Sequence, residues 1–174
     1  MPLFFVSPQQ VNALLPYDMA AGVYRLSVEV ESVRGNAVEV PIASFAPGIF
    51  TMSSNGRGEG IVLKEDGSPV SAANPALRGS VVTLFLTGLG AVDPPLNAGE
   101  PGASEEPLNR TVQTPRLFFD IFEAEVLYSG LAPGFPGLYQ VNVRVPARVS
   151  PASNIPVSLT IGGVAGNRVT IAVQ

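Results

Sequence analysis

The stretch that decides the fold lies near the C-terminal end and reads Tyr139-Gln140-Val141-Asn142-Val143-Arg144-Val145. Successive side chains of a β-strand point to opposite faces, so the tyrosine and the three valines share one face and the polar residues share the other. The turn formers Gly137 and Pro146 bound the stretch. The pattern predicts a β-strand with one buried face.

The same alternation recurs along the chain between turn-forming residues. It predicts strands at residues 26–30, 36–40, 81–86, 157–161 and 169–173, with further candidates at 49–52, 60–64, 116–120 and 124–128. The 174 residues include 17 prolines and 18 glycines, which act against long helices. Helix-like pieces near residues 8–14 and 72–77 allow a turn or two at most. Many short strands with close turns indicate an all-β sandwich.

The apolar positions of the later strands predict a core. Its expected members are Val81, Leu84 or Phe85, Val141, Val143, Val157, Leu159, Ile161, Val169 and Ile171.

Part of the chain repeats. Gln10-Val11-Asn12 recurs as Gln140-Val141-Asn142, and Gly35-Asn36 recurs as Gly166-Asn167. The two offsets differ by a single position, so one inserted residue reconciles them. The alternating apolar residues align as well, so both copies are expected to bury the same face.

The two copies are preceded by segments of unequal length, so the first copy is expected to lack its opening strands. The sheet formed by the first copy would then expose an apolar face and a free edge. We expect a hairpin at residues 49–64 to fold back over that face, because it is apolar and tethered nearby. The alternative is a strand from another chain or from an upstream region. With an internal cover, the chain is expected to be a monomer.

The composition excludes several classes of function. The chain has no His, Cys or Trp, which removes Cys/His zinc sites, disulfides, Cys nucleophiles and triads with an imidazole base. A net charge of −4 provides no basic surface for nucleic acid. No apolar run reaches the length of a membrane span, and no signal peptide is evident at the N-terminus. We expect neither a cofactor nor a bound metal.

Some side chains still offer candidate chemistry. The carboxylate pairs Glu29/Glu31 and Glu123/Glu125 would suit glycoside hydrolysis, but spacing by two is also typical of the solvated face of a strand. Glu65 and Asp66, together with either Asp93 or Glu100, would supply oxygen ligands for a calcium ion. Their spacing lacks the density of a calcium loop, so surface charge beside turns is the expected role.

Other candidates belong to different classes of site. A hydrolase with a lysine base would need Lys64 beside one of Ser68, Ser71 and Ser80. Sugar binding would use exposed tyrosines among Tyr17, Tyr24, Tyr128 and Tyr139. Residues 56–60 favour a hairpin tip over a phosphate loop, and Asn109-Arg110-Thr111 fits a glycosylation acceptor. The irregular stretch 91–114 is the first place to look for function.

Loop motifs that occur in order along the chain carry a resemblance: Asp66-Gly67-Ser68, Asn74-Pro75-Ala76, Arg78-Gly79-Ser80, Thr87-Gly88-Leu89-Gly90, Leu131-Ala132-Pro133-Gly134 and Leu138-Tyr139-Gln140-Val141-Asn142. With segments 2–16 and 46–50, they make the whole chain resemble the uncharacterised C-terminal domain family of Solibacter and related soil Acidobacteria. Asp120-Ile121-Phe122-Glu123 departs from it, because the family tends to have a Gly-Gly hairpin turn there. Residues 79–174 are separately similar to an IPT/TIG immunoglobulin-like domain.

The internal repeat and these resemblances together predict two tandem immunoglobulin-like β-sandwich units, a shortened one at residues 1–75 that includes the hairpin 49–64 and a complete one at 76–174. They also imply a non-catalytic structural or interaction module at the C-terminal end of a larger exported bacterial protein, extracellular or on the cell surface. The family offers no catalytic residue to carry over, and the binding residues are unknown. The alternatives are a glycan-binding module and a hydrolase that uses a carboxylate pair or a Ser–Lys pair.

Overall fold

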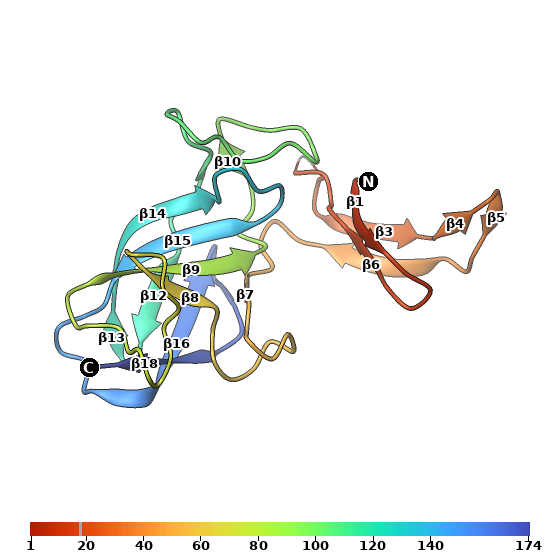
Figure 1. The fold of residues 1–174 in the computed structure, drawn as a ribbon. Coiled ribbons are helices and arrows are strands. Elements are labelled where there is room, and N and C mark those ends of the chain that lie inside the picture. Colours follow the sequence, from red (N-terminus) through yellow and green to blue (C-terminus); the bar gives the residue numbers. More distant parts are fainter. Residues whose placement is uncertain (18) are drawn as a thin grey trace.

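The computed structural model describes residues 1–17 and 19–174, and within them the chain is all-β with no helix. Every pairing between these strands is antiparallel, and the two largest sheets form a β-sandwich-like body (Figure 1). The all-β prediction is therefore confirmed. The helix-like piece at residues 8–14 contains a short strand, and residues 72–77 form turns and bridges.

The body contains two sheets. The first has the order β10(Val92–Asp93), β11(Arg110–Thr111), β14(Glu125–Leu131), β15(Tyr139–Arg144), β9(Val81–Thr87) and β7(Gly48–Ile49), and β8(Val62–Lys64) also pairs with β9. The second has the order β13(Phe122–Glu123), β12(Arg116–Phe119), β16(Ala152–Ile161) and β17(Val164–Ala165), and β18(Val169–Val173) also pairs with β16. The strand predicted at 139–145 thus lies at the centre of the first sheet, between β14 and β9.

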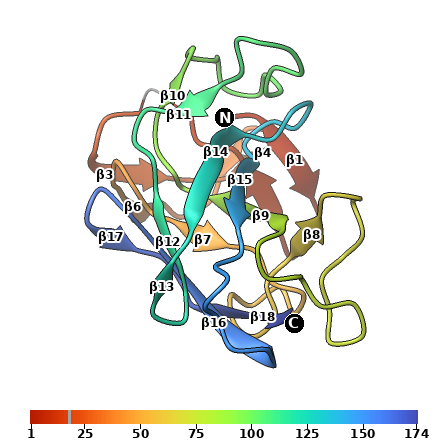
Figure 2. The same cartoon turned by 90° about the vertical axis from the view of Figure 1, so that its left-hand side faces the viewer.

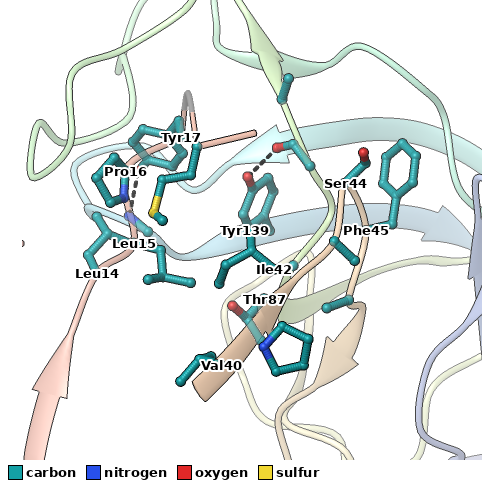
Figure 3. Close-up of a pocket in the computed structure, with 18 of the residues that line it drawn as sticks. Leu14, Leu15, Pro16, Tyr17, Val40, Ile42, Ser44, Phe45, Thr87 and Tyr139 are labelled. Atoms are coloured by element: carbon teal, nitrogen blue, oxygen red, sulfur yellow. Dashed lines mark hydrogen bonds between the residues drawn. The ribbon is translucent and has the colours of Figure 1, made fainter. Parts of the chain in front are cut away.

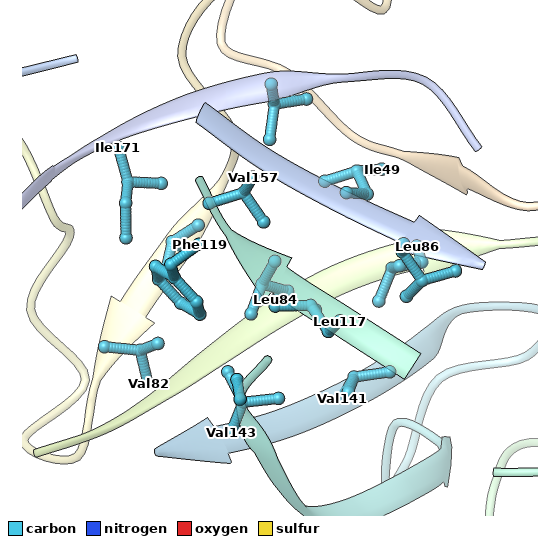
Figure 4. Close-up of a cluster of buried hydrophobic side chains, with 14 of the residues drawn as sticks. Ile49, Val82, Leu84, Leu86, Leu117, Phe119, Val141, Val143, Val157 and Ile171 are labelled. Atoms are coloured by element: carbon cyan, nitrogen blue, oxygen red, sulfur yellow. The ribbon is translucent and has the colours of Figure 1, made fainter. Parts of the chain in front are cut away.

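The core lies between these two sheets (Figure 4). Val141 and Val143 on β15 lie opposite side chains of the second sheet such as Leu117 and Val157, and all four are fully buried. The predicted core is confirmed except for Val81, which is only half-buried, and of the two alternatives Leu84 and Phe85 it is Leu84 that is buried. The buried residues of β9 are Val82, Leu84 and Leu86. Their even numbering follows from strand alternation once Leu84 faces inward.

Residues 1–17 and 19–42 form an arm beside the body, and we use that name below. It contains three two-stranded sheets: β1(Leu3–Val6) with β2(Val11–Ala13), β3(Gly22–Leu26) with β6(Val38–Ile42), and β4(Glu29–Val30) with β5(Val33–Arg34). The arm extends to one side of the body in Figure 1 and lies behind it in Figure 2. Almost all of its strand residues are exposed.

The hairpin β3 to β6 of the arm has the register of the hairpin β16 to β18 of the body. At the offset of the sequence repeat, the pairs Tyr24–Val40, Arg25–Glu39 and Leu26–Val38 correspond to Ile155–Ile171, Pro156–Thr170 and Val157–Val169. At the tip, Val30–Val33 corresponds to Ile161–Val164. The Gly35 N–H donates to the Val28 carbonyl at 2.8 Å, and the Gly166 N–H donates to the Leu159 carbonyl at 2.9 Å. The sequence repeat is therefore also a repeat of strand pairing.

The hairpin β1 to β2 shows a second correspondence. Its register shifts by one residue between the pairs Leu3–Ala13 and Phe5–Asn12. The pairing of β14 with β15 has the same shift, between Val126–Val143 and Tyr128–Asn142. In both copies a glutamine amide donates to the asparagine side chain two residues on, at 2.7 Å for Gln10 and Asn12 and at 2.9 Å for Gln140 and Asn142. The strand β2 is therefore the counterpart of β15, and β1 is the counterpart of the middle of β14.

Residues 49–64 do not cover the arm. Ile49 pairs with Leu86 and Val62 pairs with Leu84, so both ends of the segment belong to the first sheet of the body. The expectation that this hairpin folds back over the first copy is wrong. Apolar alternation indicates that a segment needs a cover, but it does not indicate which of two similar sheets provides it. The boundary expected between residues 75 and 76 accordingly does not coincide with a change of sheet.

Two turns form without glycine. Asp120 adopts a φ of 56° and allows Phe119 to pair with Phe122, so a hairpin turn forms at this place although the sequence has no glycine there. Glu31 and Ser32, with φ of 48° and 69°, occupy the places of Gly162 and Gly163. Glu31 is therefore a turn residue, and the expectation that Glu29 and Glu31 share one strand face is wrong.

Candidate functional site

The arm carries the most unusual surface of the described chain. Leu26, Val28, Val30 and Val38 are between 37% and 65% exposed. Their counterparts in the body are at most 2% exposed: Val157, Leu159, Ile161 and Val169. Because the pairing registers agree, these are equivalent positions, and only those of the body are covered by further strands. We call the four exposed side chains the arm face.

Strand β2 of the arm also has an open edge. Its counterpart β15 pairs with β14 on one side and with β9 on the other. Within the described chain, β2 pairs with β1 alone. The open edge therefore corresponds to the one that β9 occupies in the body, and an edge of this kind can pair with a further strand.

A second edge is open at β3 and β4. Strand β12 pairs with residues 157–160 in the body, and Arg116 lies opposite Thr160. The arm counterpart of Thr160 is Glu29, whose carboxylate lies 3.5 Å from the Arg34 guanidinium across the hairpin. Both of these side chains are solvated, so the pair contributes little to stability.

The segment that joins the arm to the body is held by backbone contacts. The Ala46 N–H donates to the Gly88 carbonyl at 2.9 Å. The Phe45 ring lies against Gly90 and Gly162, where an added Cβ would stand 2.7 Å and 2.3 Å from the ring. Both positions require glycine, because the Phe45 ring approaches them closely and because φ is 83° at Gly90 and 57° at Gly162. The aromatic side chain thus fixes the end of the arm to both sheets.

A cavity of about 520 Å³ lies at this junction (Figure 3). Its walls are mainly apolar and come from the arm, the joining segment and the body, with Leu14, Val40 and Ile42 on the arm side. Tyr17 accepts a hydrogen bond from the Gly137 N–H at 2.9 Å, and Tyr139 donates to the Gly90 carbonyl. Burial raises the pKa of both phenols, so both are neutral at ordinary pH.

The four candidate tyrosines have structural partners. Tyr128 donates to the Leu131 carbonyl at 2.8 Å, and the Arg110 guanidinium lies 5.1 Å from the centre of its ring. Tyr24 on the arm donates to the Ala20 carbonyl at 3.0 Å and keeps the most exposed ring of the four. The structure does not bring these rings together into one sugar platform.

The carboxylate pairs are structural as well. Glu123 forms two hydrogen bonds with Arg116, at 2.7 Å and 2.8 Å, and Glu125 bonds Arg144 at 3.0 Å. Bonding to Arg116 lowers the pKa of Glu123. A general acid in glycoside hydrolysis needs a raised pKa, so this pair is unsuited to that role. Glu31 lies in the turn described above, whereas Glu29 lies on the strand before that turn, so the two carboxylates do not share a strand face.

The acidic residues considered for calcium serve the loops in which they stand. Asp66 accepts hydrogen bonds from the Ser68 N–H and hydroxyl, which lowers the pKa of Asp66. Glu100 accepts from the side chain and N–H of Asn97, which lowers its pKa in the same way. Within residues 1–17 and 19–174, no three metal-ligating side chains gather into one group.

Lys64 does not contact a serine hydroxyl among the hydrogen bonds of the described residues. Its ammonium donates to the Asn74 side-chain oxygen, and the Asn74 amide donates to the Ser68 hydroxyl at 3.1 Å. Ser71 accepts from the Asn74 N–H, and the Ser80 hydroxyl donates to the Leu77 carbonyl at 2.7 Å. The asparagine thus separates the lysine from the nearest candidate nucleophile, so this cluster orders a loop.

The stretch 91–114 is a loop closed by the pairing of β10 with β11. Its organising residue is Asn109, which is only 3% exposed. The Asn109 oxygen accepts from the Ala103 N–H and its amide donates to the Pro94 carbonyl, both at 2.7 Å. A buried amide with both groups engaged is inaccessible to glycosylation, so this motif is structural. The Gly56–Gly60 segment is a hairpin tip, as expected, and Gly58 accepts from the Thr170 N–H at 2.8 Å.

One important residue was missed in the sequence. Asn167 accepts from the Ile49 N–H at 2.6 Å and donates to the Ile49 and Gly56 carbonyls at 2.9 Å and 2.8 Å. It therefore holds the segment that begins with β7 against the hairpin of β18. Its repeat counterpart is Asn36, which is exposed in the arm. The Gly-Asn pair that marks the repeat was the available signal.

In the described residues, 1–17 and 19–174, there is no helix long and apolar enough to cross a membrane. Comparison of the chain with protein-family models, with curated proteins and with solved structures found no match.

Proposed function

We propose that this chain is a non-catalytic structural or interaction module, made of two tandem immunoglobulin-like β-units of which the first is shortened. The main observation in support is that the strand register of β3 and β6 in the arm agrees with that of β16 and β18 in the body. A unit that repeats the strand pairing of a closed sandwich but leaves the same face open is suited to contact another polypeptide.

The roles of the polar side chains support the non-catalytic part of the proposal. Each carboxylate of the pair Glu123 and Glu125 is bonded to an arginine, and Lys64 bonds an amide. These groups stabilise turns and strand ends. The apolar cavity at the junction likewise offers two neutral phenols, both already engaged in hydrogen bonds.

The setting follows from the family resemblance of the loop motifs. In that setting the module stands at the C-terminal end of a larger exported bacterial protein, outside the cell or on its surface, and its partner is another part of that protein or a second protein. An antibody raised against the chain tests this. Immunoblots of fractionated source cells should show the antigen in the exported fraction, and an antigen confined to the cytosol would contradict the setting.

Two assays separate this function from its alternatives. The purified chain is expected to release no product from model esters or glycosides above the blank, and to bind no glycan on an array. Turnover that persists through purification and falls in Glu123→Gln or Lys64→Met would establish a hydrolase. Glycan binding that is lost in Tyr24→Ala would establish a sugar-binding module.

A further inference from the structure

The body shows what covers the equivalent of the arm face. Strand β9 pairs with β15 in an antiparallel register that sets Leu84 opposite Val141 and Val82 opposite Val143. The inward side chains of β9 are buried with those of β16 and β18 in one core. In the arm, β2 stands in the place of β15 but no strand stands in the place of β9 within the described chain.

The open edge of β2 keeps the polar group that fixes this register. In the body, the Asn142 side-chain oxygen accepts from Gln140 at 2.9 Å and from the Thr83 hydroxyl of β9 at 3.1 Å. In the arm, the Asn12 oxygen accepts from Gln10 at 2.7 Å. A carbonyl oxygen has two lone pairs, so Asn12 can accept a second hydrogen bond from a threonine opposite it.

The second edge corresponds to the place that β12 occupies in the body, in the sheet that lies opposite the sheet of β9. A strand that pairs with residues 26–29 as β12 pairs with residues 157–160 would set an arginine in the place of Arg116 opposite Glu29. In the body that opposite position is the uncharged Thr160. The exposed Asn36 adds a further anchor, because its counterpart Asn167 binds both backbone groups of Ile49.

From these observations we propose that the arm binds a β-strand that pairs antiparallel with β2 and carries a threonine between two apolar residues, as in Val82-Thr83-Leu84. The threonine donates to Asn12, and the apolar residues cover the arm face. The donor is a strand of another polypeptide segment, since β9 of this chain is already paired on both edges, with β15 on one side and with β7 and β8 on the other. This proposal rests on the proposed function and names the partner.

A labelled peptide with the sequence of residues 79–90 is a direct probe, with two added lysines for solubility. Fluorescence anisotropy should show saturable binding to the intact chain at micromolar concentration. The peptide variant Thr83→Val keeps the shape of the strand but loses the hydroxyl, and its affinity should fall about fivefold for one hydrogen bond. A scrambled peptide with the same lysines should not bind.

Two chain variants locate the site. Val28→Asp places a carboxylate on the arm face and should weaken binding at least tenfold. Val23→Asp is the matched control, because Val23 is 68% exposed and its counterpart Asn154 is an exposed residue of the body. This control should bind like the unchanged chain. Circular dichroism of both variants should match that of the parent, because neither side chain belongs to the core of the body.

Several outcomes would overturn the proposal: no peptide binding, equal binding of the scrambled peptide, or equal loss in both chain variants. A dimer of the chain alone that Val28→Asp dissociates would identify the occupant as a second copy and would also refute it. Failure of the strand-partner proposal is distinguishable from failure of the proposed function. If the peptide does not bind and the chain releases no product from model substrates, only the strand partner is refuted. If the chain does release product, the non-catalytic module is refuted, with or without peptide binding.

Discussion

The repeat provides a matched pair of substitutions, Val169→Ala in the body and Val38→Ala in the arm. The two positions are equivalent in strand register, and both changes remove the same two methyl groups. Val169 is 1% exposed and Val38 is 63% exposed, so the two changes differ in burial alone.

The expected cost follows from that difference. Val169 lies close to Gly60, where an added Cβ would stand 3.0 Å from a valine methyl. Loss of two buried methyl groups plus the cavity that remains should cost about 2 to 3 kcal/mol. A sandwich of this size should then melt about 6 to 9 °C lower. Val38→Ala should change the stability by less than about 0.5 kcal/mol.

Thermal melts and urea titrations followed by far-ultraviolet circular dichroism measure both variants against the parent chain. Equal midpoints for the parent and Val38→Ala, with a lower midpoint for Val169→Ala, are the expected result. If Val38→Ala costs as much as Val169→Ala, then the arm face is covered in solution and the argument from exposure fails. Size exclusion at several concentrations would then show whether a second copy covers it.

Three further predictions concern the body and the junction. Asn167→Ala should cost roughly 2 to 3 kcal/mol in urea unfolding because the β7 segment loses its polar anchor, whereas Asn36→Ala in the arm should be neutral. Gly90→Ala should cost about 1 to 3 kcal/mol, because it forces a φ of 83° on a residue with a Cβ against the Phe45 ring. Burial raises the pKa of Tyr139, so the stability it contributes is complete below pH of about 10 and is lost as the pH rises above that value. Its ionisation should coincide with unfolding in an alkaline titration of tyrosinate absorbance, and ionisation in the folded chain would contradict the burial.

The strands of the body could be predicted from the sequence because period-two alternation is a local signal. Residues 139–145 and 169–173 each carry it between turn formers, and both form the strands expected. The phase of β9 was harder to predict, because Val81, Val82, Leu84, Phe85 and Leu86 are all apolar and alternation cannot be read from them. Only the pairing of Leu84 with Val141 determines which set faces inward.

The turns show a second limit of prediction from sequence. A two-residue hairpin turn with positive φ at both positions is usually recognised by glycine or asparagine, and Gly162-Gly163 carries that signal. Glu31-Ser32 adopts the same conformation without that signal, so the local sequence carries no sign that Glu31 departs from the strand predicted at residues 26–30. The repeat alignment itself held the missing information, because it sets Glu31-Ser32 on Gly162-Gly163.

Only one feature of the candidate site could be predicted from the sequence. The unequal lengths before the two copies predicted an open face on the first copy, and the arm face is that surface. The cover could not be predicted, because apolar residues at 49–64 are equally compatible with either sheet. The deciding contact is polar and distant in sequence: the side chain of Asn167 on the backbone of Ile49.

The exposed face also determines how the arm responds to a partner. Full burial of a valine or leucine contributes about 1.5 to 3 kcal/mol, so four side chains left about half exposed forgo roughly 4 kcal/mol in total. That sum is close to the whole stability of a small domain, and folding units as short as the arm usually need additional support. The joining segment at Phe45 and the hydrogen bond between Gly137 and Tyr17 provide some of this support. A strand that covers the arm face would therefore order the arm as it binds, and the ordering would cost part of the affinity. Amide exchange in the arm should slow when the peptide of residues 79–90 binds, while exchange in β9 and β15 of the body stays unchanged.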